Sequence, residues 1–181
     1  MRKINEIFYS LQGEGYHTGT PAVFIRFSGC NLKCSFCDTQ HEEGAMLTDE
    51  KIMEEVKKYP ATMVVLTGGE PSLWIDDDLI DRLHVAGKYV CIETNGTRVL
   101  PESIDWVTCS PKQGSKLEIA RVNEVKVVYE GQDISIYESL FAEHFYLQPC
   151  SCNNTAETVD CVMQHPKWRL SLQTHKLIDI R

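Results

Sequence analysis

The segment GCNLKCSFCDT, residues 29–39, carries three cysteines in the spacing C-x3-C-x2-C. Three thiolates so close in sequence suit a [4Fe–4S] cubane, which has four irons to ligate. Cys30, Cys34 and Cys37 would leave the fourth iron open unless a distant cysteine reaches it. An open iron can bind and reduce a small molecule, whereas a fully ligated cluster mostly transfers electrons. The segment therefore predicts an enzyme, with these three cysteines as metal ligands and catalytic centre.

Two other interpretations of the cysteine segment stay open. Zinc sites usually combine paired C-x2-C or Cys/His sets, and only Cys34 and Cys37 fit half of that pattern. Free cysteines can also pack as small apolar side chains. The full spacing, with the aromatic Phe36 directly before the third cysteine, favours the open cluster.

Composition bounds the class of protein. A chain of 181 residues favours one domain over residues 1–181, large enough to bury about 70% of its unfolded surface. Its net charge of −8 argues against a general nucleic-acid binder, which needs a basic face. No stretch approaches a membrane span, and MRK at the start is followed by mixed residues rather than an apolar signal core. We expect a cytoplasmic protein with reduced cysteines and neither membrane nor nucleic-acid partners.

Short β-rich runs alternate with helical runs. Strands are predicted over residues 21–27, 62–67, 89–93, 106–109, 124–129, 145–148 and 169–172. Helices are predicted from a cap at Thr48 to the basic turn at 57–58, and over 76–86, 134–141 and 155–164. The connections 94–105 and 110–123 lack helical periodicity, and a complete eight-fold barrel needs about 250 residues. The predicted fold is α/β, a partial, reduced (β/α) barrel.

Polar or glycine-rich residues follow the predicted strands, where barrel enzymes build their sites. They are TGGEP at 67–71, ETNG at 93–96, SPK at 110–112, QP at 148–149 and QTHK at 173–176. The glycines at 68–69 would let the backbone approach a ligand closely, and Glu70 could take an ammonium group or brace the turn. Taken alone, this is a common strand-to-helix turn. The turn follows the next predicted strand after the cysteine segment, and this position favours a functional role.

The cysteine segment and the Gly-Gly-Glu turn together resemble the radical S-adenosylmethionine (SAM) superfamily. The resemblance implies a single radical SAM domain, with a [4Fe–4S] cluster on the three cysteines and SAM chelated to the open iron. It also implies that the methionine amino group meets residues 68–70 and that Phe36 lies against the adenine. One electron from the cluster then cleaves SAM to a 5′-deoxyadenosyl radical, which abstracts hydrogen from a substrate.

A closer resemblance covers nearly the whole chain. LQGEG at 11–15, the run through Arg26 to Cys30, and LQTHK at 172–176 are similar to the 7-carboxy-7-deazaguanine synthase family. That family converts 6-carboxy-5,6,7,8-tetrahydropterin to 7-carboxy-7-deazaguanine with loss of ammonia, on the route to queuosine and related deazapurines. The resemblance implies a carbon–nitrogen lyase assisted by Mg2+, a homodimer, and an electron donor such as flavodoxin or ferredoxin.

The resemblance also implies roles for individual residues. Residues that contact the pterin are expected to be Leu11, Gln12, Gly13, Glu14, Arg26, Thr67, His175 and the C-terminal Arg181. Residues that contact SAM are expected to be Phe36, Cys37, Asp38, Gly69, Ser110, Pro111, Lys112, Gln148, Pro149, Cys150 and Ser151. The hydroxyl of Thr39 is expected to bind Mg2+. Arg26 suits the substrate carboxylate, because a guanidinium binds a carboxylate through two hydrogen bonds.

Structural alternatives remain for several of these residues. Arg26 could form a structural ion pair, Thr39 could cap a turn, and His175 could be a core residue on the last strand. Cys91 and Cys109 are expected to pack within apolar strands, and Trp74, Trp106 and Trp168 to lie in the core or at an interface. Glu93 and Asn95 could equally be hydrogen-bonding residues at the rim or ligand contacts. Cys150 and Cys152 are too few for a second cluster.

Two other function classes also remain. One is a radical SAM activase that makes a glycyl radical on a partner protein, which would need an open groove for a polypeptide loop. The other is a non-catalytic iron–sulfur or zinc module.

Overall fold

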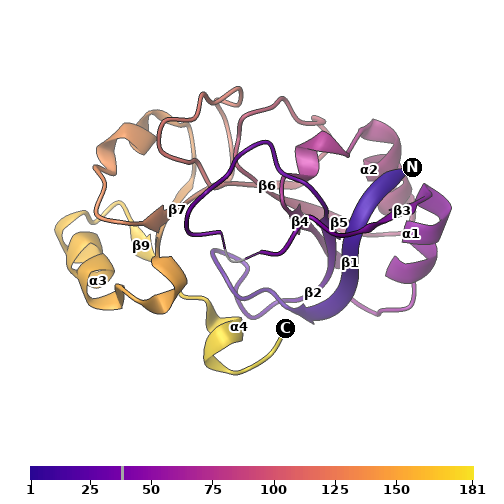
Figure 1. The fold of residues 1–181 in the computed structure, drawn as a ribbon, viewed down its shortest axis with the longest axis horizontal. Helices are drawn as coiled ribbons and strands as arrows, with labels where there is room; N and C mark the ends of the chain where they lie inside the picture. Colours follow the sequence, from indigo (N-terminus) through magenta and orange to yellow (C-terminus); the bar gives the residue numbers. More distant parts are fainter. Residues whose placement is uncertain (38) are drawn as a thin grey trace.

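The computed structural model describes residues 1–37 and 39–181. Its single sheet has nine strands in the order β3-β1-β2-β4-β5-β6-β7-β8-β9, and it curves without closing (Figure 1). The strands are β1 (Arg2–Leu11), β2 (Pro21–Phe27), β3 (Ala45–Leu47), β4 (Met63–Gly68), β5 (Tyr89–Thr94), β6 (Trp106–Cys109), β7 (Glu124–Tyr129), β8 (His144–Pro149) and β9 (Arg169–Leu170). Strands β2 and β4 to β9 are parallel, while β1 is antiparallel to both of its neighbours. The predicted partial barrel is confirmed.

The described residues also form four α-helices and three short 3-10 helices, of which all but the last, after β9, lie between strands. They are α1 (Asp49–Val56), η1 (Pro71–Leu73), α2 (Asp77–Val85), η2 (Ser135–Ser139), η3 (Cys150–Cys152), α3 (Thr155–Gln164) and α4 (Thr174–Leu177). Thr48 caps α1 by accepting a hydrogen bond from the backbone N–H of Lys51, as predicted. The connections 94–105 and 110–123 contain no helix, which confirms that expectation.

Three segments differ from the prediction. Residues 134–141 form only the 3-10 helix η2, because Ile134, Tyr137 and Leu140 are the buried positions and a three-residue spacing matches three residues per turn. Strand β9 ends at Leu170, so His175 lies on α4 rather than on a strand. The short β3 pairs with the start of β1 and was not expected.

Successive side chains of each strand point to opposite faces of the sheet, so apolar side chains form separate clusters on the two faces. On the outer face of β4, Val64 and Leu66 pack in the cluster that also contains Ile52 of α1 and Leu83 of α2. On the inner face, Val65 packs in a cluster with Phe8, Ala22, Phe24, Met63, Cys91 and Trp106. Thr67 follows Val65 on that inner face and lines a cavity. The apolar cluster therefore fills one part of the interior and leaves the carboxyl ends of the strands for polar residues.

The cysteines and tryptophans outside the predicted site largely pack as expected. Cys91 and Cys109 are buried, and burial raises the pKa of both thiols, that of Cys109 to about 12. Trp106 and Trp168 are buried as well. All eight cysteines lie in the described part of the chain and are free thiols. Every helix found among the described residues is too short or too polar to cross a membrane.

Leu66 gives a direct test of the core. It is fully buried between the sheet and the two helices, so Leu66→Ala should lower the free energy of unfolding by about 2–5 kcal/mol in urea titrations. Val85 on α2 is 90% exposed, and Val85→Ala should change it by less than about 0.5 kcal/mol. Equal effects of the two substitutions would contradict the assignment of Leu66 to the core.

Candidate active site

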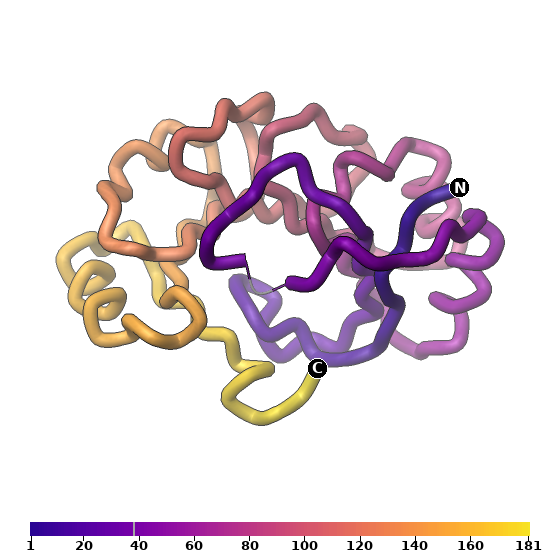
Figure 2. The backbone as a smooth tube through the Cα atoms, in the orientation of Figure 1, coloured from indigo at the N-terminus to yellow at the C-terminus, as the bar shows by residue number. Residues whose placement is uncertain are grey.

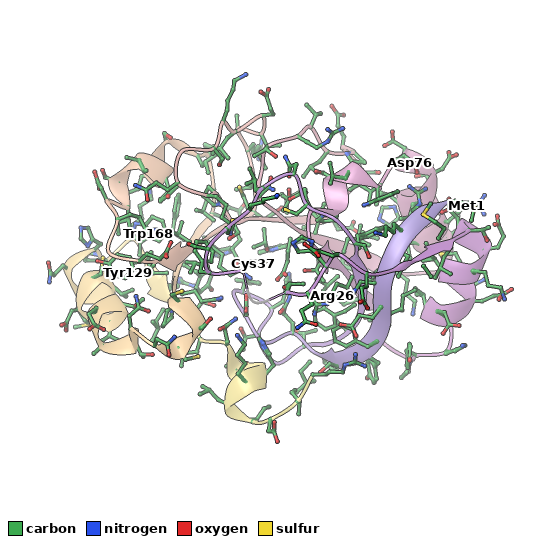
Figure 3. The ribbon with its side chains drawn as sticks, viewed as in Figure 1. Met1, Arg26, Cys37, Asp76, Tyr129 and Trp168 are labelled. Carbon is green, nitrogen blue, oxygen red and sulfur yellow. The ribbon has the colours of Figure 1, made fainter. Side chains whose placement is uncertain are left out.

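The cysteine loop leaves the carboxyl end of β2 and crosses in front of the strands (Figure 2). Backbone hydrogen bonds fix its base: Ser28 N–H donates to the Lys3 carbonyl at 2.9 Å, and Gly29 N–H to the His41 carbonyl at 2.7 Å. Cys30, Cys34 and Cys37 all line one cavity of about 1280 Å³. Figure 3 places Cys37 and Arg26, which lines the same cavity, within the curve of the sheet.

The Gly-Gly-Glu turn after β4 packs directly against this loop. Gly69 N–H donates to the Phe27 carbonyl at 3.1 Å, and Glu70 N–H donates to the Gly29 carbonyl at 2.9 Å. A Cβ atom on Gly69 would lie 2.0 Å from the Gly29 carbonyl oxygen, so no other residue fits there. Glycine at 69 is therefore required for the turn to sit beside the cysteines.

Glu70 braces the turn. Its side chain is fully buried and accepts hydrogen bonds from the Thr94 hydroxyl at 2.8 Å, the Asn95 N–H at 2.7 Å and the Ser72 N–H at 3.0 Å. These donors come from the turn itself and from the end of β5. Of the two roles considered for Glu70, the structure shows the bracing role.

The donor set fits a [4Fe–4S] cluster, since three thiols from one loop face the same cavity. Burial raises the pKa of the Cys30 thiol, and a hydrogen bond from the Leu32 N–H partly opposes this. Within residues 1–37 and 39–181, no three His, Cys, Asp or Glu side chains are placed to hold a single metal ion. Thr39 lines the cavity. Asp38, expected to contact SAM, lies outside the described residues.

The residues expected to contact SAM come from the next strand ends. Those that line the cavity are Phe36, Cys37, Gly69, Ser110, Lys112, Gln148, Pro149, Cys150 and Ser151. Pro111 instead lines a smaller adjoining pocket together with Phe36 and Lys112. The Lys112 ammonium donates to the Ser110 hydroxyl at 2.6 Å and lies 5.6 Å from the centre of the Phe36 ring. Burial lowers the pKa of Lys112, and the nearby Cys34 opposes that shift.

A carboxylate–lysine network of Glu14, Glu93 and Lys126 forms another part of the wall. The Lys126 ammonium contacts the Glu14 carboxylate and lies 3.2 Å from Glu93 Oε1. Thr67 donates to Glu93 Oε2 at 3.0 Å and Gln12 to Glu93 Oε1 at 3.3 Å. Two carboxylates and one ammonium leave a net charge of −1, which suits a ligand edge rich in N–H donors.

The charges in this network stabilise one another. Burial alone would raise the pKa of Glu14, but the charge and hydrogen bond of Lys126 hold it below its usual value. Burial alone would lower the pKa of Lys126, but Glu14, Glu93 and Glu124 raise it. Lys126 therefore stays protonated, and Glu14 ionised, across the neutral range.

Lys126 was missed in the sequence. The signal available was the alternation in β7, where Glu124 and Lys126 stand two residues apart between valines and so point to the same face. A charged pair on the inner face of a barrel strand favours a site residue.

The other predicted pterin contacts also reach the cavity: Leu11, Gln12, Gly13, Arg26, His175 and Arg181 all line it. His175 lies against Gly13, where a Cβ atom would be 2.1 Å from its Nδ1. The Thr174 N–H and hydroxyl both donate to the Gly13 carbonyl at 2.9 Å, which ties α4 to the LQGEG turn. Arg26 does form an ion pair, with Glu6 at 2.9 Å, while still facing the cavity. The cavity thus gathers every predicted site residue in the described part except Pro111.

The open barrel and the cysteine loop with its Gly-Gly-Glu neighbour define a radical SAM protein. The family model described as "Radical SAM superfamily" matches residues 24–127, more than half of the chain. Membership implies a [4Fe–4S] cluster and SAM as cofactors.

Individual relatives show which family within this superfamily the chain resembles. A 7-carboxy-7-deazaguanine synthase from Bacteroides thetaiotaomicron is 86% identical over 181 residues, all of both chains. One from Bradyrhizobium diazoefficiens is 41% identical, covering 98% of each chain. The crystal structure of QueE from Escherichia coli matches with a TM-score of 0.79 and 31% identity, over 94% of this chain and 93% of that one. The chain belongs to the 7-carboxy-7-deazaguanine synthase family, which confirms the resemblance.

Replacing Lys126 should destabilise the fold more than replacing the exposed Lys116. Lys126→Met leaves two half-buried carboxylates without their buried cation and should lower the free energy of unfolding by about 2–4 kcal/mol. Lys116→Met removes an exposed partner of Glu118 and should cost less than about 1 kcal/mol in the same urea titration. A Lys126→Met variant as stable as Lys116→Met would contradict the charge assignment.

Glu124 should make stability depend on pH. Its carboxylate is buried and accepts a hydrogen bond from the Tyr16 N–H at 3.0 Å, and burial raises the pKa of Glu124 to about 7. The folded state then holds a proton that the unfolded state has released, so this contribution to stability is complete below about pH 4.5 and lost as pH rises through about 7. Between pH 5 and 8, wild type should lose about 2–3 kcal/mol of unfolding free energy relative to Glu124→Gln. Parallel pH profiles for the two proteins would contradict the raised pKa.

Proposed function

We propose that the protein is a 7-carboxy-7-deazaguanine synthase, a carbon–nitrogen lyase that contracts the ring of 6-carboxy-5,6,7,8-tetrahydropterin and releases ammonia. The observation that carries this proposal is the 86% identity with the Bacteroides synthase over the whole of both chains. The product would enter queuosine or related deazapurine biosynthesis.

The cavity has the groups that such a substrate requires. The pyrimidine edge of a pterin presents N–H donors, and Glu14 and Glu93 present carboxylate acceptors held by Lys126. The substrate also carries a carboxylate, and Arg26 presents a guanidinium to the same cavity. Groups of opposite charge, suited to the two ends of one small molecule, therefore line the same cavity.

Cys30, Cys34 and Cys37 would hold the cluster, and the residues after β4, β6 and β8 would hold SAM. When bound, these cofactors supply the one-electron chemistry that removes a hydrogen atom from the substrate. The protein's part is to orient the pterin through its polar edges and keep it within reach, since orientation supplies much of the rate in such reactions. Lys126 keeps Glu14 and Glu93 fixed in position while this occurs.

A metal ligand, a dimer and an electron donor are also part of the proposal. Thr39 would give its hydroxyl oxygen to Mg2+, because hard cations prefer oxygen ligands. A homodimer would cover an exposed edge strand of the open sheet, β3 or β9. A flavodoxin or ferredoxin would deliver the electron, and the enzyme would work in the cytoplasm.

An anaerobic assay tests the proposal. Purified protein with reconstituted cluster, SAM, Mg2+, the carboxypterin and a strong one-electron reductant should form 7-carboxy-7-deazaguanine, detected by mass spectrometry. Cys34→Ala should abolish product, whereas Cys161→Ala on α3, outside the cavity, should retain wild-type turnover. Cluster-loaded wild type that cleaves SAM but forms no deazaguanine would overturn the proposed substrate.

A further inference from the structure

Alternate residues of β1 hold the end of the chain against the cavity. Glu6, Phe8 and Ser10 stand two residues apart, so they share one face of the strand. The Glu6 carboxylate contacts the Arg181 guanidinium, and the Ser10 hydroxyl donates to the Arg181 carbonyl oxygen at 2.5 Å. The Arg181 guanidinium also lies over the Phe8 ring, 5.1 Å from its centre. Three side chains of one strand therefore position one residue from the opposite end of the sequence.

The same carboxylate also holds Arg26. Glu6 and Arg26 are direct partners across the β1–β2 ladder, and Arg26 Nε donates to Glu6 Oε1 at 2.9 Å. Arg26 lies over the same Phe8 ring at 5.6 Å. Each oxygen of Glu6 thus serves a different arginine, and one phenyl ring lies beneath both guanidinium groups.

The geometry leaves the binding atoms of Arg26 available. Among the described residues, Arg26 hydrogen-bonds only through Nε, so its two Nη atoms keep the paired donors that recognise a carboxylate. Glu6 therefore orients Arg26 through Nε and leaves the two Nη atoms available to a ligand. The side chains of Glu6, Arg26 and Arg181 together carry two positive charges and one negative charge, which favours a ligand with a carboxylate.

We propose that Glu6, Arg26 and Arg181 form a carboxylate-binding subsite in which Glu6 is the positioning residue and the Arg181 guanidinium is the second cation. This inference rests on the proposed function and extends it, because it assigns recognition of the 6-carboxylate to a cluster of three side chains. All three residues line the cavity. The side chains of Glu6 and Arg26 are 26% and 24% exposed, so water screens their charges only in part, whereas the Arg181 side chain is 69% exposed and its charge is screened more.

A double-mutant cycle in binding tests the proposal. The proteins are wild type, Glu6→Gln, Arg181→Ala and the double variant, each loaded with cluster and SAM under anaerobic conditions. Arg181→Ala removes the guanidinium and leaves the backbone of residue 181 in place. Equilibrium dialysis measures the Kd for 6-carboxy-5,6,7,8-tetrahydropterin and for tetrahydropterin, which has the same ring without the carboxylate.

Glu6→Gln should weaken binding of the carboxypterin about five-fold, the loss expected for a partly exposed charge-assisted contact. Arg181→Ala should weaken it about three-fold, because water screens the more exposed guanidinium. The double variant should be no weaker than about the worse single variant, because Arg181 acts only when Glu6 positions it. Binding of tetrahydropterin should change by less than about two-fold in all four, and Glu6→Asp should restore part of the affinity. Arg82→Ala removes an arginine from a surface pair with Glu50 on the outer helices and should bind both pterins as wild type does.

Several results would overturn this subsite. They are additive losses in the double variant, an unchanged Kd in Arg181→Ala, tighter binding in Glu6→Gln, or equal losses for both pterins. Failure of the proposed function looks different. Wild type that binds the carboxypterin through this cycle but forms no deazaguanine would overturn the reaction and leave the subsite standing, whereas wild type that binds neither pterin would overturn both.

Discussion

The parallel register between β2 and β4 fixes the relation of the two segments that carry the cofactor chemistry. Phe27 pairs with Gly68, so both strands end at the same level and both connecting loops leave the same edge of the sheet. The Gly69 N–H then donates to Phe27 at the end of β2, and the Glu70 N–H donates to Gly29 in the cysteine loop. Gly69 lies so close to the Gly29 carbonyl that no side chain fits at position 69. A slip of either strand by one residue would reverse the faces of that strand's side chains and change how the two loops meet.

Glu70 extends this constraint to the next strand. Its buried carboxylate accepts from the Asn95 N–H, and the Asn95 side chain donates to Asn31 Oδ1 at 3.0 Å, within the cysteine loop. The loop is therefore held from β4 and from β5 at once. The interior beside the loop is apolar near Phe24 and Trp106 and polar near Thr67 and Glu93. The cavity therefore lies where the inward-facing side chains change from apolar to polar.

Much of the fold could be predicted because it depends on local pattern. The strand at 124–129 and the helix at 155–164 have the predicted bounds, since apolar periodicity and turn residues mark their ends. The cysteine spacing and the glycine turn are local patterns too, and the residues that they marked line one cavity. Prediction was poorer where a segment depends on distant partners. The strand β3 exists only because β1 offers it an edge, and η2 follows the three-residue spacing of its buried side chains.

The same distinction applies to the site. The predicted residues at strand ends reach the cavity because the topology brings those ends together. Lys126 could not be assigned a role, since its partners lie at positions 14 and 93 and only the folded sheet joins them. The contact between Glu6 and Arg181 joins residues near opposite ends of the chain, and no spacing in the sequence indicates it.

The proposed chemistry depends on one iron of a cubane that Cys30, Cys34 and Cys37 would leave open to SAM. Electron paramagnetic resonance of the reduced, reconstituted protein tests this, before and after SAM is added. We expect the signal of a reduced [4Fe–4S] cluster whose g-values shift when SAM binds at the open iron. A cluster signal that SAM leaves unchanged, or folded protein that incorporates no iron, would contradict it.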